Sequence, residues 1–231
     1  GTITATLSLI LLSRYSTYVA QNDTESLVRE FHNSVGGLVL FLAPIALLTC
    51  IFAYDIVSIV YLRGEFDAAA AQITAQALVG FAVGFPLIAV REMFIRLHLA
   101  YQNTRMPMLA NVAAVVLNAA LSIVLAQFIG ILGVALATSL SVLLTIFLLN
   151  RSVRQYIPQH RFSQFLPLFA RTAAACALSG AAAVFLRGAL PLGLLPRFMV
   201  TVVCAAAVYL AALLALRCPE LTGMLGAVRT K

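Results

Sequence analysis

Apolar runs of membrane-spanning length recur from one end of this chain to the other, and no other feature limits its fold as much. About 20 apolar residues in a helix cross a hydrocarbon layer roughly 30 Å thick. Hydrophobic residues make up 62% of the chain and charged residues 10%, whereas an ordinary soluble domain carries roughly 25% charged residues. The solvent for the fold is therefore lipid, and we expect an all-α, polytopic membrane protein.

The apolar runs predict about seven transmembrane helices, separated by polar connections. The first is short for a complete crossing, and Gly130 with Gly133 allows a tight reversal between the fourth and the fifth. The predicted segments cover residues 2–12, 35–53, 68–90, 108–128, 131–149, 165–186 and 198–216.

The basic residues divide unequally between the two sides of the membrane. If the segments alternate in direction, Arg63, Arg187 and Arg197 lie on one side, and the other twelve of the 15 basic residues lie on the opposite side. Positive charge is enriched on the cytoplasmic side of membrane proteins. We therefore expect the twelve in the cytoplasm, in a multi-pass protein of the inner membrane whose C-terminus is cytoplasmic.

Several classes of function are not indicated by the sequence. The basic residues sit between apolar runs and do not alternate with stacking aromatics, so nucleic acid is not an expected partner. The four cysteines are far apart, and the three histidines lie in separate polar connections without a nearby set of acids. No nucleophile elbow, metalloprotease motif or phosphate-binding glycine loop is present. We expect no enzyme activity, no cofactor and no metal site.

The segment that begins near residue 68 carries charges at its far end. Asp67 is placed to cap the helix, and Arg91 follows 24 residues later, about 36 Å along a helix and just past the apolar layer. Glu92 and Arg96 have the four-residue spacing of helical ion pairs. We therefore expect the helix to continue beyond the membrane, and Pro107 to mark the start of the next one.

The same helix has features of close packing and bending. Gly80 and Gly84 form a small-xxx-small pair that permits close contact between membrane helices. Pro86 removes a backbone donor, which predicts a kink near Gly84.

Seven polar residues are candidates for a substrate path. The charged group is either an anchor at the cytoplasmic interface or a cationic patch that meets a phosphate headgroup. The two asparagines share a helix face with Ser122, and either form hydrogen bonds between helices or line a hydrated cavity. The candidates are Arg91, Glu92, Arg96, His98, Arg105, Asn111 and Asn118.

The composition changes after residue 154. A basic linker leads to an alanine-rich pair of segments with small side chains that suit close helix packing. We divide the chain into membrane helices at 1–154 and a peripheral helix pair with a cytoplasmic tail at 155–231. The pair either offers an apolar groove to lipid or serves as scaffold.

The stretch "YLRGEFDAAAAQITAQALVGFAVGFP", followed by "AYQNTRMP", resembles the C-terminal half of the lipid II flippases of the MurJ/MviN family. In that family a Gly-x-Phe-Asp turn precedes a helix with "TAQAL", the helix reaches a Gly-x-Pro kink, and Thr-x-x-Pro opens the next segment. The matching positions here are Gly64, Phe66, Asp67, Thr74, Ala75, Gly84, Pro86, Thr104 and Pro107.

This resemblance implies export of a lipid-linked glycan precursor across the bacterial cytoplasmic membrane by alternating access of two lobes. Such flippases have fourteen helices, and seven segments that end inside the cell correspond to the last seven. The resemblance implies a missing N-terminal lobe, in the same or a second chain, and membrane lipid as a further partner. Two alternatives remain: an exporter of polysaccharide precursors or small cationic compounds, and a membrane scaffold that transports nothing.

Overall fold

The computed structural model describes residues 2–61, 67–157, 165–189, 191 and 193–216, and these residues form helices and short connections without a strand. The helices are α1 (Thr2–Ala20), α2 (Thr24–Ile51), α3 (Ala53–Tyr61), α4 (Ala68–Ala100), α5 (Arg105–Val153), α6 (Leu166–Ala189) and α7 (Leu194–Ala215).

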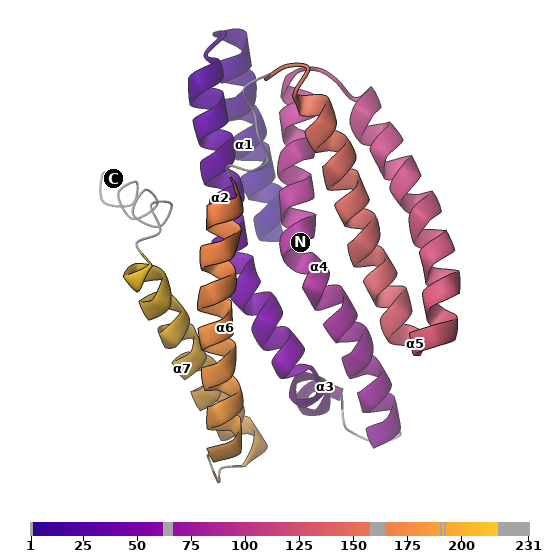
Figure 1. Cartoon of the computed structure of the whole chain (residues 1–231), viewed down its shortest axis with the longest axis vertical. Helices are drawn as coiled ribbons and strands as arrows, with labels where there is room; N and C mark the ends of the chain where they lie inside the picture. Colours follow the sequence, from indigo (N-terminus) through magenta and orange to yellow (C-terminus); the bar gives the residue numbers. More distant parts are fainter. Residues whose placement is uncertain (1, 62–66, 158–164, 190, 192, 217–231) are drawn as a thin grey trace.

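Five of these helices, α2, α4, α5, α6 and α7, are long and apolar enough to cross a membrane. Helix α5 contains two crossings, because its backbone reverses at Ile129 and Gly130 (Figure 1). Gly130 has φ +60° and open space around it, so the backbone conformation, and not crowding, requires glycine there. The prediction of about seven helices is confirmed, with the reversal between residues 128 and 131. The short helix α3 was not predicted.

The helices alternate in direction, so their ends gather at two ends of the molecule (Figure 1). One end holds the start of α2, the end of α4 and both termini of α5, and α6 begins in the same half of the molecule. We call it the arginine-rich end. The other holds α3, the start of α4, the α5 reversal and the α6–α7 turn, and we call it the reversal end.

The described arginines follow this division. Arg187 near the end of α6 and Arg197 near the start of α7 belong to the reversal end. The others lie in the half of the molecule toward the arginine-rich end; they are Arg14, Arg29, Arg91, Arg96, Arg105, Arg151, Arg154 and Arg171. The helices thus alternate in direction, as was assumed when the basic residues were divided between the two sides of the membrane.

Capping side chains determine where two of the long helices begin. The carboxylate of Asp67 accepts a hydrogen bond from the Ala70 amide at 2.8 Å, so the predicted cap of α4 is confirmed. Asp23 caps α2 in the same way through the Ser26 amide. Helix α2 therefore begins eleven residues before the predicted apolar segment, which starts at residue 35, because the polar residues that precede this segment are helical as well. Gly64 and Phe66 lie outside the described residues.

Helix α4 is 33 residues long and remains helical through Pro86. It also continues past Arg91 to Ala100, as predicted. Figure 1 shows that its axis changes direction about halfway along. The expected bend is therefore present without a break in the helix.

A close helix contact joins α4 to the second half of α5. A Cβ atom on Gly80 would lie 2.5 Å from the Cβ of Ala135, and one on Gly84 would lie 2.7 Å from the hydroxyl of Ser139. That hydroxyl donates a hydrogen bond to the Gly80 carbonyl at 3.0 Å. The predicted small-residue pair is thus the surface on which α5 packs.

An aromatic cluster joins four segments toward the arginine-rich end. Phe31 of α2 is its centre, and its ring meets Tyr15 of α1, Phe94 of α4 and Phe165, which directly precedes α6. The ring centroids are 5.0 to 6.3 Å apart, and the rings meet edge to face, an arrangement that aromatic quadrupoles favour. All four side chains are buried. This cluster fixes the start of the α6–α7 hairpin on the other helices.

The α6–α7 hairpin packs mainly on α2. Ser179 of α6 donates a hydrogen bond to the Ala205 carbonyl of α7 at 2.8 Å, which holds the two helices of the hairpin together. The Tyr209 hydroxyl of α7 donates to the Leu40 carbonyl of α2 at 2.8 Å. The hairpin is thus attached to one helix of the bundle.

We predict that Gly80→Ala destabilises the protein, because the new methyl group would overlap Ala135 and push α5 away from α4. Overpacking of this kind costs about 1–3 kcal/mol. The measurement is the free energy of unfolding in detergent micelles. Gly188→Ala is the control, since a Cβ there meets nothing within 4 Å. Equal stability of the two variants would show that the contact is not tight.

Candidate functional site

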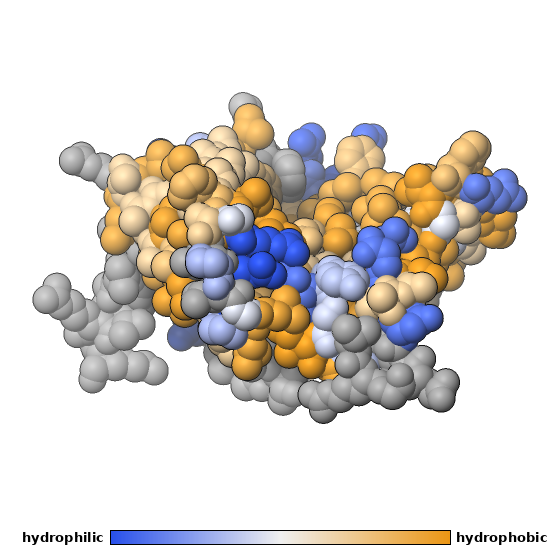
Figure 2. Space-filling view, turned by 90° about the horizontal axis from the view of Figure 1, so that it is seen from below, coloured by the Kyte–Doolittle hydropathy of each residue, from blue (hydrophilic) through white to orange (hydrophobic). Residues whose placement is uncertain are grey.

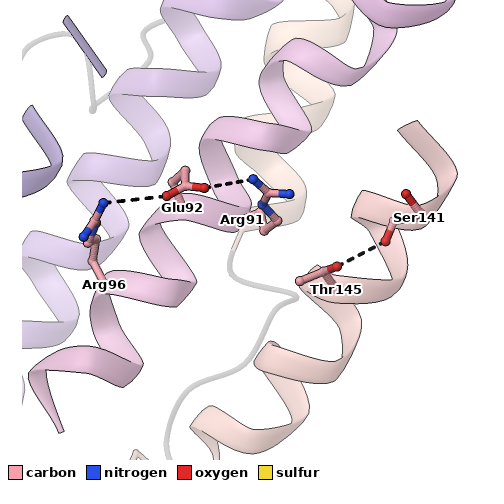
Figure 3. Close-up of polar contacts among 5 residues, drawn as sticks. All are labelled: Arg91, Glu92, Arg96, Ser141 and Thr145. Atoms are coloured by element: carbon pink, nitrogen blue, oxygen red, sulfur yellow. Dashed lines mark hydrogen bonds and ion pairs between the residues drawn. The ribbon is translucent and has the colours of Figure 1, made fainter. Parts of the chain in front are cut away.

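Two arginines share one carboxylate on the arginine-rich half of α4 (Figure 3). Arg91 Nη2 lies 2.9 Å from Glu92 Oε1, and Arg96 Nη2 lies 3.9 Å from Glu92 Oε2. We call these three residues the arginine array. Figure 3 shows Glu92 between the two arginines, with Arg91 on the side of Ser141 and Thr145 of α5.

The arginine array has an excess of positive charge and of hydrogen-bond donors. Its side chains are 23% to 28% exposed. The Nε atoms of Arg91 and Arg96 are buried and, within the described part of the chain, have no acceptor. Guanidinium groups with free donors suit phosphate oxygens. The partly exposed guanidinium groups can therefore contact an anion, whereas their Nε atoms are too buried to reach it.

His98 does not belong to this surface. Its side chain is fully buried, and Nδ1 lies 2.8 Å from the Phe94 carbonyl. The ring meets Tyr156 edge to face at 6.1 Å. The polar character of histidine suggested a place among the arginines, but its ring is buried in the core and cannot contact an anion at the surface.

Arg105 is exposed at the first position of α5, at the same end of the molecule as the array. The connection before it is held by side chains whose role was not predicted. The amide oxygen of Asn103 accepts from the Met106 amide at 3.1 Å, and its nitrogen donates to the Tyr156 hydroxyl. Tyr101 stacks on Tyr156 at 4.5 Å. These contacts tie the α4–α5 connection to the turn that follows α5. Pro107 lies in the first turn of α5, as predicted.

The two candidate asparagines of α5 have different surroundings. Asn118 donates to the Thr138 hydroxyl at 3.3 Å and accepts from the Ser122 hydroxyl at 2.9 Å. This small network joins the two halves of α5, so one of the two expected roles, a hydrogen bond between crossings, is present. Asn111 is exposed on the first half of the helix and does not belong to the network.

A further ion pair at the reversal end could not be expected from sequence order. Arg187 of α6 reaches Asp55 of α3, and 132 residues separate the two in the chain. The charge distribution assigned Arg187 to one side of the membrane, but it did not link this arginine to Asp55.

Comparison with known proteins gives a consistent result. The family model described as "Lipid II flippase MurJ" matches residues 1–205. The probable lipid II flippase MurJ of Bdellovibrio bacteriovorus is 30% identical over 128 residues, which are 55% of this chain and 24% of that protein. The lipid II flippase MurJ of Thermosipho africanus is 24% identical over 156 residues, or 68% of this chain and 32% of that protein.

The fold also matches a solved structure, that of a lipid II flippase MurJ in an inward closed conformation. The TM-score is 0.71 at 21% identity, and the match covers 89% of this chain and 41% of that one. The matched regions thus amount to less than half of each of these proteins. Since the family model covers the chain from α1 into α7, this chain belongs to the MurJ family of lipid II flippases.

Proposed function

We propose that the chain is part of a membrane flippase that exports lipid-linked peptidoglycan precursor, lipid II, across the cytoplasmic membrane by alternating access. The observation that carries this proposal is the family match over residues 1–205. The solved structure adds a shared fold. No observation favours an exporter of other precursors or cationic compounds, or a scaffold that transports nothing.

We place the arginine-rich end in the cytoplasm, because membrane proteins concentrate basic residues on that side. The C-terminus is then cytoplasmic too. A second lobe, in the same or another chain, would complete the transport path, since the matched relatives are about three to four times as long as the matched regions. Residues 1–154 would form the lobe that faces it, and residues 155–231 a peripheral pair and tail.

Within this proposal the arginine array contacts the precursor's pyrophosphate on the cytoplasmic side. Glu92 compensates only one of its two arginine neighbours, and the array is partly exposed. A phosphate group that displaces water from the guanidinium donors would gain charge-assisted hydrogen bonds. The array can therefore bind the headgroup before the lobes change orientation.

The proposed function can be tested in a bacterium whose own lipid II flippase is depleted. We expect the complete gene product to restore growth, because it supplies the missing export step. The measurement is growth together with the amount of the protein in the membrane. Failure to restore growth despite normal membrane levels would contradict the proposal.

We predict that Arg96→Ala lowers lipid II export by about 10- to 100-fold, since a lost charge-assisted contact costs roughly 1.5–3 kcal/mol. The measurement is transport of labelled lipid II by the complete gene product in proteoliposomes.

The matched control is Arg154→Ala, an exposed arginine at the same end of the molecule, just after α5. It removes the same charge from the same side but not from the array. Equal transport by the two variants would show that the array has no special part in export.

A third test concerns the polar network of α5. Asn118→Leu removes both of its hydrogen bonds, whereas Thr138→Val removes the bond between the crossings and leaves Asn118 in place. Hydrogen bonds between membrane helices contribute about 0.6 kcal/mol on average, so both variants should fold.

If Asn118 lines the path, Asn118→Leu lowers lipid II export more than Thr138→Val does in the same proteoliposome assay. Equal export by both variants would limit Asn118 to a structural role.

A further inference from the structure

The ion pair between Arg187 and Asp55 lies where two structural units meet. Helix α2 ends at Ile51, Phe52 interrupts the helix, and α3 begins at Ala53. The α6–α7 hairpin packs beside this break. Seen from this end, Figure 2 shows a hydrophilic patch in the middle of a largely hydrophobic surface. Charged groups in such surroundings need partners.

Arg187 makes three contacts with the break. Its Nη2 atom lies 3.1 Å from both carboxylate oxygens of Asp55, and its Nη1 atom donates to the Ile51 carbonyl at 3.0 Å. Its guanidinium carbon stands 5.6 Å from the centre of the Phe52 ring. The last carbonyls of a helix have no partner in the next turn, so a side chain from α6 completes the end of α2.

The two charges are exposed to different degrees. The Asp55 side chain is 5% exposed and that of Arg187 is 36% exposed. A buried carboxylate without a counter-charge is strongly disfavoured. Asp55 therefore holds Arg187 in place, and with it the end of α6.

Apolar contacts surround the ion pair. The Phe52 ring meets Phe198 of α7 edge to face at 5.4 Å, and Phe52 packs with Ala183 and Ala205 in a small buried cluster. A single ring thus contacts the arginine of α6 and the phenylalanine of α7. Both helices of the hairpin meet the break at this point.

The hairpin has a second hydrogen bond to α2, from Tyr209 to Leu40. Eleven residues separate Leu40 from Ile51, about 16 Å along a helix. The two attachments are therefore well separated. If the contact at the break is lost, the Tyr209 bond remains as a pivot about which the reversal end of the hairpin can swing.

We propose that Arg187 and Asp55 are a positioning pair, which holds the reversal end of the α6–α7 hairpin against the break between α2 and α3. The pair sets the orientation of the hairpin relative to α2, α3 and α4. This role does not depend on the transported cargo, so it stands or falls separately from the proposed function.

The test measures distances between spin labels in the complete gene product in lipid nanodiscs, with its native cysteines replaced by alanine. One label is at Val203 of α7 and the other at Ile73 of α4, both exposed. A second pair, Leu178 of α6 with Val203, reports on the hairpin itself. We expect one narrow distance peak from each pair in the otherwise unaltered protein.

Arg187→Met removes the charge and the donors but keeps a long side chain. We expect the Val203–Ile73 peak to broaden or to shift to longer distances, while the Leu178–Val203 peak stays narrow. Arg197→Met is the matched control, because Arg197 is at the same end of the hairpin and its side chain has no ion pair among the described residues. It should leave both peaks unchanged.

A double variant distinguishes an effect on the position of the hairpin from an effect on the thermal stability of the protein. Arg187→Met leaves the buried Asp55 charge unpaired, and adding Asp55→Asn removes that charge. We expect the double variant to recover thermal stability and to keep the broadened Val203–Ile73 distances. A narrow, unshifted peak in either variant would overturn the proposal, since the hairpin would then keep its position without the ion pair.

Discussion

The contact between α4 and the second half of α5 is the constraint on which the rest of the structure depends. In lipid there is little hydrophobic force between helices, so they are held by close packing and hydrogen bonds. Gly80 and Gly84 let the backbones approach until Ala135 and Ser139 fill the space. This contact places the residues that follow the α5 reversal beside α4. It also stabilises α4, the helix that carries the arginine array.

Helix α4 thereby connects the two ends of the molecule. At the reversal end, α4 begins at the Asp67 cap, next to α3. Toward the arginine-rich end, it carries the arginine array and Phe94 of the aromatic cluster. The hairpin, by contrast, is held through α2 at both ends, by Phe165 near its start and by Arg187 near its turn. A lobe with one continuous central helix and a hairpin attached beside it can move as a unit, as the proposed alternating access requires.

Much of this architecture could be predicted from the sequence, because lipid leaves few choices. The length of the apolar runs predicts the crossings, Asp67 predicts the start of α4, and Gly130 predicts the reversal. Contacts between distant residues could not be predicted in this way. The partner of Arg187 depends on how α6 packs beside α2, and the buried ring of His98 meets Tyr156, which is 58 residues away in the chain. The four-residue spacing of Glu92 and Arg96 predicted their ion pair. That the Nε atoms of Arg91 and Arg96 have no acceptor among the described residues became visible only in the structure.

The measurement that tests the central claim most directly is competition for transport by the purified complete gene product in proteoliposomes. Labelled lipid II would be followed across the bilayer in the presence of an excess of unlabelled precursors. Our account predicts that unlabelled lipid II abolishes the signal, whereas an undecaprenyl-linked polysaccharide precursor with a different glycan leaves most of it. Transport that both precursors suppress equally, or no transport of lipid II at all, would contradict the assignment of lipid II as the cargo.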